Sequence, residues 1–204
     1  MNAAKWVALR RDPTLRSLVR SADTVAADGI SVVWLSRWLG TPLPGRVPGI
    51  ELAERLLDRA AATRWRVALL GARPEVVRTV ASQLARRGID VVSAQDGYSE
   101  EPEAWADAIA AAHPDLMLVA LGSPRAERFV AHHADRWPGT LVLGVGGAFD
   151  VWAGKVPRAP RWARLGGLEW AARFVREPRR RFRRAIVDSA RFLVAAALGQ
   201  RVPQ

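Results

Sequence analysis

The sequence predicts an α/β fold: a Rossmann-like, mostly parallel sheet flanked by helices, followed by a basic helical C-terminal appendage. Short apolar runs alternate with longer stretches of helical periodicity, and glycine-rich turns follow several of the runs. The appendage is predicted from charge. Residues 155–204 hold thirteen basic and three acidic side chains, so they carry nearly all of the net charge of +11. We therefore expect an α/β core at 1–154 and an Arg-rich appendage at 155–204.

The first third of the chain is expected to be largely helical, with one short strand. In order, its elements are a helical stretch over 6–20 that Asp12 and Pro13 interrupt or start, a strand over 24–27, an apolar segment over 30–39, a Pro/Gly loop over 41–48 and a helix over 50–62. The predicted strand ends at Asp28 and Gly29, and Gly40 stops the apolar segment.

The middle of the chain alternates strands with helices. Strands are predicted over 66–70, 90–93, 116–121 and 141–145, and helices over 74–87, 102–112 and from Pro124 onward. This alternation predicts a parallel sheet with helices on both faces. In such sheets, ligands bind outside the carboxyl ends of the strands.

Three of the predicted strands end in loops that could bind an anion. They are Asp28-Gly29, the loop 122–127 and the loop 146–150. Glycine lets a backbone approach a ligand, and N–H groups at the start of a helix favour anions. Plainer roles remain open: turn residues at the glycines, helix caps at Asp28 and Asp150, and a solvated first-turn carboxylate at Glu127.

Several common cofactor motifs are absent. The sequence has no Walker-type phosphate loop, no D-x-D carboxylate pair and no cysteine. The segment 144–149 fails the dinucleotide fingerprint, because Phe149 stands where the last glycine belongs. His113, His132 and His133 form no recognisable ligand set and are expected on the surface. We therefore expect neither a metal nor a cofactor.

A series of motifs in a fixed order resembles the bacterial WecG/TagA/CpsF glycosyltransferase family over residues 2–184. The motifs are Asp28-Gly29, Arg46-Val47-Pro48-Gly49, Gly122-Ser123-Pro124-Arg125, the segment 146–155, Arg158-Ala159-Pro160, Leu168-Glu169-Trp170 and Arg176-Glu177-Pro178-Arg179. The resemblance implies inverting, metal-independent transfer of a sugar, N-acetylmannosamine in the best-known members. The implied donor is a UDP-sugar and the implied acceptor a sugar linked to polyprenyl diphosphate. The implied pathways are teichoic acid, exopolysaccharide or related cell-surface polysaccharide synthesis.

The resemblance also implies site residues. Asp28 is expected to be the general base, with Asp150 as the competing candidate. The residues expected to bind substrate are Asn2, Arg46, Gly49, Gly122, Pro124, Arg125, Glu127, Gly146, Gly147 and Asp150. Those expected to contact the diphosphate or the membrane are Lys155, Arg158, Arg173, Arg179 and Arg184.

Two positions depart from the family pattern. Ala126 stands where the family usually has Gln, which predicts a changed preference for donor or acceptor. The sequence begins at the Asn, here Asn2, that a strand and a Thr precede in the family. This departure leaves open a changed start, a lost strand or an incomplete acceptor site.

The predicted setting is the cytoplasmic face of the cell membrane, where the enzyme is peripheral. The expected partners are the UDP-sugar, the lipid-linked acceptor and anionic lipid, with a homo-oligomer possible and no nucleic acid. Helices predicted at 168–177 and 185–198 either lie on the membrane and close over the active site, or pack with solvated arginines. A nucleic-acid-binding protein that uses the Arg-rich tail is the main alternative, and a structural peripheral membrane protein is the third.

Overall fold

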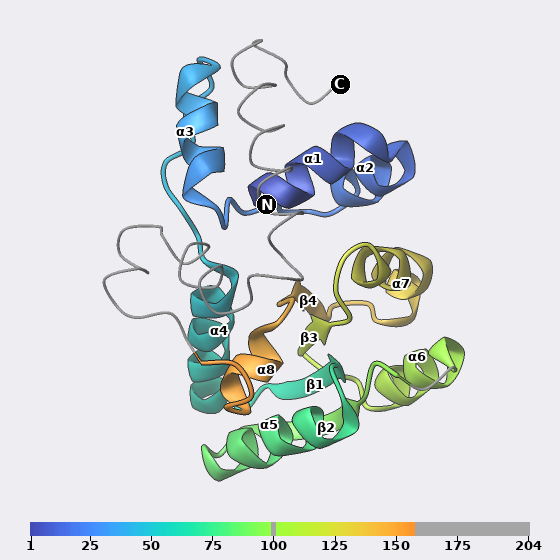
Figure 1. Cartoon of the computed structure of the whole chain (residues 1–204). Coiled ribbons are helices and arrows are strands. Elements are labelled where there is room, and N and C mark those ends of the chain that lie inside the picture. Colours follow the sequence, from blue (N-terminus) through green and yellow to red (C-terminus); the bar gives the residue numbers. More distant parts are fainter. Residues whose placement is uncertain (99–100, 158–204) are drawn as a thin grey trace. The chain divides into compact units, whose positions relative to one another are not determined.

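The computed structural model describes residues 1–98 and 101–157, and these form two compact units, 1–48 and 49–157 (Figure 1). Both units lie largely within the predicted core, and the predicted boundary at residue 154 stays a prediction. The two tail helices and four of the predicted site residues lie outside the described residues. These four are Arg158, Arg173, Arg179 and Arg184.

The unit of residues 1–48 contains the helices α1 (Ala3–Arg11), α2 (Pro13–Arg20) and α3 (Ile30–Trp38). Asp12 ends the first helix and begins the second. Its backbone N–H donates to the carbonyl of Ala8 at 3.0 Å, and its carboxylate accepts the N–H of Leu15 at 2.9 Å. The predicted interruption at Asp12 and Pro13 is therefore confirmed, because the carboxylate caps α2 and the proline suits its first turn.

The strand predicted over 24–27 is wrong: residues 24–27 have no regular secondary structure and pair with no strand of the described residues. Two of its carbonyls accept from separated residues instead. The carbonyl of Ala26 accepts from the N-terminal ammonium group of Met1, and the carbonyl of Ala27 accepts the N–H of Val47 at 2.8 Å. A strand needs a ladder of successive partners on a neighbouring strand, which single contacts of this kind do not supply.

The unit of residues 49–157 is built on a four-stranded parallel sheet. Its strands are β1 (Arg66–Gly71), β2 (Asp90–Gln95), β3 (Leu116–Ala120) and β4 (Leu141–Gly144), in the order β2-β1-β3-β4. Leu69 of β1 pairs with Leu118 of β3, which pairs with Leu143 of β4. All four strands were predicted from their apolar runs, and the parallel sheet is confirmed.

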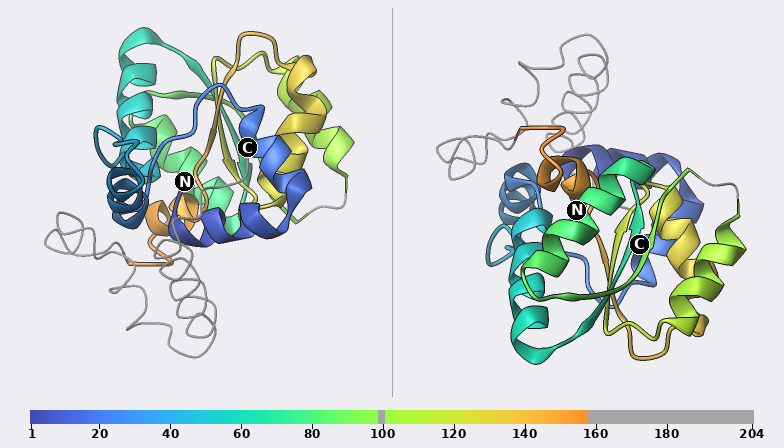
Figure 2. Two further views of the ribbon diagram at one scale, coloured as in Figure 1. Left: turned by 90° about the horizontal axis from the view of Figure 1, so that it is seen from above. Right: turned by 90° about the horizontal axis from the view of Figure 1, so that it is seen from below.

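Helices cover both faces of this sheet (Figure 2). They are α4 (Gly49–Thr63), α5 (Pro74–Arg86), α6 (Pro102–Ala111), α7 (Arg125–His133), the short 3₁₀ helix η1 (Ala134–Arg136) and α8 (Ala148–Trp152). Val67 and Leu69 of β1 face the cluster that α4, α5 and α8 complete. Ala68 and Leu70 face the opposite cluster, which α6 and α7 complete. This alternation follows from the two-residue period of a strand. The α8 helix is an addition to the elements predicted.

Within the described ranges, we find no helix whose length and apolar character suffice to cross a bilayer.

Candidate functional site

A cavity of about 600 Å³ opens at the carboxyl ends of the strands in the unit of residues 49–157. The chain passes from β1 to β2 on one side and then to β3 on the other, so the strand order reverses between β1 and β3. This reversal is where open parallel sheets form ligand crevices. The cavity is lined by Ala72, Arg73, Glu75, Val76, Gly97, Tyr98, Ala120, Leu121, Gly122, Arg125, Gly146, Gly147, Asp150, Lys155 and Val156.

The structure brings six of the predicted site residues together in this cavity. They are Gly122, Arg125, Gly146, Gly147, Asp150 and Lys155. They come from two segments, 122–125 and 146–155, that lie far apart in the sequence and follow the neighbouring strands β3 and β4. Gly49, Pro124 and Glu127 belong to the same unit but are not among the lining residues.

Arg73 and Tyr98 also line the cavity and were missed in the sequence. Arg73 follows β1 directly before α5, and Tyr98 follows β2. Each comes shortly after a glycine at a strand end, Gly71 or Gly97, which is the signal that marked the other loops. The Tyr98 side chain is 66% exposed, so its ring is open to a ligand.

Arg125 is held at the cavity by two contacts. Its Nη1 donates to the backbone carbonyl of Gly97 at 2.6 Å, and its guanidinium lies 5.3 Å from the ring centre of Trp105. The first contact joins α7 to the loop after β2, and the second joins it to α6. A guanidinium held by a carbonyl and an aromatic face keeps further N–H groups for an anion.

Lys155 is positioned by the turn that ends α8. The N–H of Lys155 donates to the carbonyl of Asp150 at 2.9 Å, and the N–H of Gly154 donates to that of Val151 at 3.1 Å. Gly154 has a φ of 72°, so the turn is a Schellman motif in which glycine takes the left-handed position. The motif folds the chain back and carries Lys155 and Asp150 to the same cavity.

Cations outnumber carboxylates around the cavity. Three basic residues line it, Arg73, Arg125 and Lys155, against two acidic ones, Glu75 and Asp150. A cavity with this balance favours an anionic ligand, and its volume suits a small molecule of nucleotide size.

Three other predicted residues, Asn2, Asp28 and Arg46, lie in the unit of residues 1–48. Arg46 Nε donates to the backbone carbonyl of Asp28 at 2.6 Å, so the loop 41–48 is tied to the Asp28-Gly29 turn. Asn2 caps α1, because its side-chain oxygen accepts the N–H of Lys5 at 2.9 Å. The structure thus places Arg46 beside Asp28, and it shows Asn2 as the N-cap of α1.

Ala126, the position that departs from the family pattern, packs against an apolar cluster. This cluster includes Trp105 of α6 and Phe129 of α7. An alanine at this position therefore has an apolar surface to pack against.

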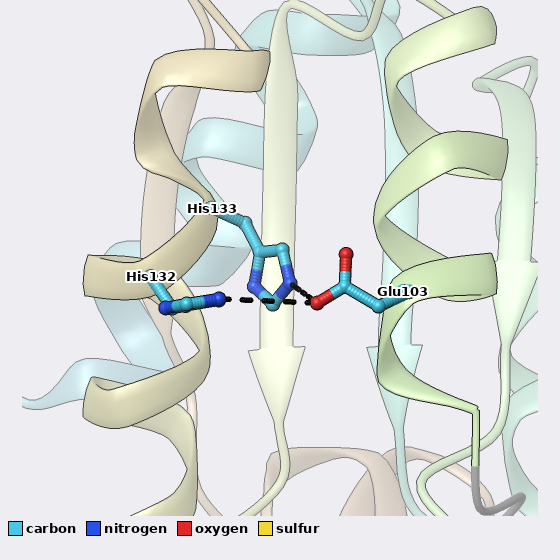
Figure 3. Close-up of side chains that lie close together, drawn as sticks. All are labelled: Glu103, His132 and His133. Carbon is cyan, nitrogen blue, oxygen red and sulfur yellow. Dashed lines mark hydrogen bonds and ion pairs between the residues drawn. The ribbon is translucent and has the colours of Figure 1, made fainter.

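A charged cluster joins α6 to α7 and corrects the expectation for His133, which is buried with only 3% of its surface exposed (Figure 3). Its Nδ1 lies 2.8 Å from the carbonyl of Phe129 and its Nε2 lies 3.0 Å from Glu103 Oε1. Both partners are acceptors, so the ring donates to both only when it is protonated. His132 Nε2 lies 3.9 Å from the same carboxylate oxygen.

The three side chains of this cluster also have the geometry of candidate metal ligands. One ligand atom from each of Glu103, His132 and His133 falls within 4.8 Å of the others. Arg136 occupies the second carboxylate oxygen of Glu103 at 2.5 Å and also pairs with Asp107 at 2.8 Å. The carboxylate is therefore already balanced by side chains, and the cluster ties helices together. The expectation of no metal stays a prediction.

This cluster predicts a pH dependence of stability. The hydrogen bond from His133, followed by that from Arg136, holds the pKa of Glu103 below its ordinary value of 4.5. A lowered pKa means that the Glu103 carboxylate stabilises the fold above its unfolded-state pKa and that this contribution is lost as the pH falls through the lower folded-state value. Glu103→Gln should therefore lower the thermal midpoint more at pH 7 than at pH 3. An equal decrease at both pH values, measured by circular dichroism, would contradict this assignment.

The fold defines an α/β protein with a parallel sheet, and the cavity at the switch point is its candidate ligand site. The chain matches the glycosyl transferase WecG/TagA/CpsF family over residues 1–204 and belongs to this family. The resemblance and the class of enzyme inferred from the motifs, a glycosyltransferase, are confirmed. Family membership favours this class over the nucleic-acid-binding alternative.

Two curated relatives share this family resemblance. A protein of Bacillus spizizenii is 37% identical over 172 residues, which cover 83% of this chain and 67% of the relative. A protein of Bacillus subtilis is 34% identical over 170 residues, which cover 82% of this chain and 66% of the relative. Both are named N-acetylglucosaminyldiphosphoundecaprenol N-acetyl-beta-D-mannosaminyltransferase. The chain thus spans about two thirds of the length of these relatives.

Proposed function

We propose that this protein transfers an N-acetylmannosamine-like sugar from a UDP-sugar to an acceptor linked to polyprenyl diphosphate, with inversion at the anomeric carbon. The observation that carries the proposal is the cavity at the switch point of the sheet, lined by Arg73, Arg125 and Lys155. The reaction belongs to cell-surface polysaccharide or teichoic acid synthesis and takes place at the cytoplasmic face of the membrane. The names of the two relatives support the donor sugar and the acceptor.

The cavity suits the diphosphate of the donor. Negative charge develops on the leaving UDP as the glycosidic bond breaks, and fixed cations stabilise that charge in the transition state. The guanidinium of Arg125 is fixed by Gly97 and Trp105, so little reorganisation is needed when the charge develops. Arg73 and Lys155 add charge from the loops after β1 and α8.

The proton of the acceptor needs a base. We assign this role to the carboxylate of Asp28, which takes the proton as the hydroxyl attacks the anomeric carbon. Arg46 holds the backbone of Asp28 through the hydrogen bond to its carbonyl. Arg46 is therefore a positioning residue for this turn as well as a proposed substrate contact.

A direct transfer assay tests the proposed function. The full chain is incubated with UDP-N-acetylmannosamine and a soluble analogue of the lipid-linked N-acetylglucosamine acceptor, and UDP release and the disaccharide product are both measured. The proposal predicts a product with inverted anomeric configuration. Absence of product with an intact, donor-binding protein would exclude this donor and acceptor pair.

Tyr98 is the proposed stacking platform for the uracil base. Its exposed ring lines the cavity, and a base stacked on an aromatic ring is stabilised by about 1–3 kcal/mol. Tyr98→Ala should therefore raise the Kd for UDP by about 10-fold, and Tyr98→Phe should keep native affinity. Isothermal titration calorimetry with UDP and with inorganic diphosphate separates binding of the base from binding of the diphosphate. An equal loss for both ligands would contradict base stacking.

The proposed reaction predicts activity without a divalent metal. Three protein cations line the cavity, and they can balance the diphosphate. Transfer rates in excess EDTA should therefore equal those in excess Mg²⁺. His132→Ala serves as the control, because it removes one candidate ligand of the α6–α7 cluster. Complete loss of transfer in EDTA that added metal restores would overturn the prediction.

A further inference from the structure

The outer face of α3 carries two exposed tryptophans. Trp34 is 60% exposed and Trp38 is 58% exposed, whereas Val33 and Leu35 on the same helix are buried. The two rings are four residues apart, so they share one side of the helix, and Arg37 lies between them. We call Trp34, Arg37 and Trp38 the tryptophan face. Tryptophan is highly buried on average in proteins, so a pair left open to solvent indicates a partner.

The loop after α3 is fixed to the helix and exposes further apolar side chains. Ser36 holds the loop 41–48 against the helix. The N–H of Leu43 donates to its Oγ at 3.0 Å, and the N–H of Thr41 donates to its carbonyl at 2.9 Å. Leu43 is 38% exposed and Val47 is 40% exposed. Four of the exposed apolar side chains of this unit, Trp34, Trp38, Leu43 and Val47, therefore lie on a helix and on the loop that hydrogen bonds attach to it.

Positive charge is concentrated on the same unit. Residues 1–48 hold seven basic and three acidic side chains, whereas residues 49–154 hold eleven basic and fourteen acidic ones. Tryptophan beside arginine is the composition that proteins place at the interface of an anionic bilayer. Two copies of this basic unit meeting through the same face would instead bring like charges together.

We propose that the tryptophan face docks this protein on an anionic phospholipid surface, with both indole rings at the level of the headgroups. Arg37, between the rings, contacts lipid phosphate. The proposed partner of the tryptophan face is thus a bilayer. Binding of a second copy of the chain at this face instead would contradict the proposal.

The docking face and the proposed base belong to one unit, which is why this surface matters for the reaction. The loop that leaves α3 returns to the Asp28 turn, where the N–H of Val47 donates to the carbonyl of Ala27 and Arg46 Nε donates to that of Asp28. A unit docked through α3 therefore carries Asp28 to the surface that holds a lipid-linked acceptor. This last step rests on the proposed function, whereas the docking itself does not.

The test compares the native full chain with the double variant Trp34→Ser/Trp38→Ser. Binding to vesicles of phosphatidylglycerol and to vesicles of phosphatidylcholine is measured by sedimentation. We expect the native chain to prefer phosphatidylglycerol and the double variant to bind it at least about 10-fold more weakly. Leu141→Ser, which removes an exposed leucine from the other unit, is the matched control and should bind as the native chain does.

A second measurement covers the case in which the serine variant is unstable. Phosphatidylglycerol with brominated acyl chains should quench the tryptophan fluorescence of the native chain, and the conservative variant Trp34→Phe/Trp38→Phe should lose most of that quenching. Equal quenching of both proteins, or native vesicle binding by a folded serine variant, would overturn the proposal. So would a native dimer that becomes monomeric in the double variant without any change in vesicle binding.

The two proposals fail separately. Transfer to the soluble acceptor analogue should be the same in the native chain and the double variant, because the tryptophan face contains none of the residues assigned to the donor or the proton. If the native chain binds vesicles through this face but transfers no sugar, the proposed function fails and the docking surface stands. If sugar is transferred but vesicle binding is the same with and without the two tryptophans, the docking surface fails and the proposed function stands.

Discussion

Asp28→Asn is expected to lower the rate of sugar transfer by at least about 100-fold and to leave UDP binding nearly unchanged. Asparagine keeps the size of the side chain but cannot take the proton of the acceptor hydroxyl. Two hydrogen bonds that anchor this turn use backbone atoms of residue 28, namely the N–H bonded to the carbonyl of Met1 and the carbonyl bonded to Arg46 Nε. The substitution therefore keeps these anchors. The measurement is initial transfer rates with a soluble acceptor, with titration calorimetry for UDP.

Asp150→Asn is the matched control for the base. Asp150 lines the cavity, and its backbone carbonyl accepts the N–H groups of Lys155 and Val156 at 2.9 and 3.0 Å. Because these bonds use the main chain, the asparagine variant should keep the α8 turn and lose much less activity than Asp28→Asn. A near-native rate in Asp28→Asn together with a large loss in Asp150→Asn would transfer the role of base to Asp150.

Gly71→Ala is expected to lower the free energy of unfolding by about 3 kcal/mol, through overpacking and a strained backbone. Gly71 ends β1 with a φ of 115°, and a Cβ placed there would lie 2.5 Å from the carbonyl carbon of Ala120. The nearest atoms are backbone atoms of Ala120 and Leu121 at the end of β3, which cannot move aside cheaply. Urea unfolding measures the loss. UDP binding should weaken too, because Ala72 and Ala120 line the cavity.

Gly88→Ala separates crowding from backbone conformation. Gly88 also has a positive φ, of 77°, but no heavy atom lies within 4 Å of the position of a Cβ. This variant should therefore lose only about 1 kcal/mol, the cost of a left-handed alanine. Equal destabilisation by the two substitutions would show that the close approach of β1 and β3 at Gly71 is not what requires glycine.

The predicted helices and strands were confirmed where the residues of the element itself determine its type. The run from Leu116 to Leu121 is apolar at every position, as a strand covered on both faces must be, and it forms β3. The segment 24–27 was predicted as a strand, but among residues 1–98 and 101–157 it has no neighbouring strand. The composition of four residues cannot show whether a partner exists. The same gap explains His133, since the sequence gives no sign that Phe129 and Glu103 surround it.

Some residues of the candidate site could also be predicted from the sequence, and others could not. The glycine-rich segments 122–127 and 146–155 were identified in the sequence, and they supply Gly122, Arg125, Gly146 and Lys155 to the cavity. Arg73 and Tyr98 did not stand out, because an arginine before a helix and a tyrosine in a loop are ordinary surface residues. Their role became visible only when the loops after β1 and β2 were placed at the same edge of the sheet.

The sequence by itself determined the α/β class, the four strands, the glycine turns and the motifs that define the family, because each depends on residues close together in the chain. The strand order β2-β1-β3-β4, the cavity at its switch point and the cations that meet there were decided by tertiary structure. The physical reason is that local periodicity specifies which face of a strand is buried but not which strand lies beside it. Contacts between Arg125 and Gly97, or between Glu103 and His133, exist only once the strands and helices have packed.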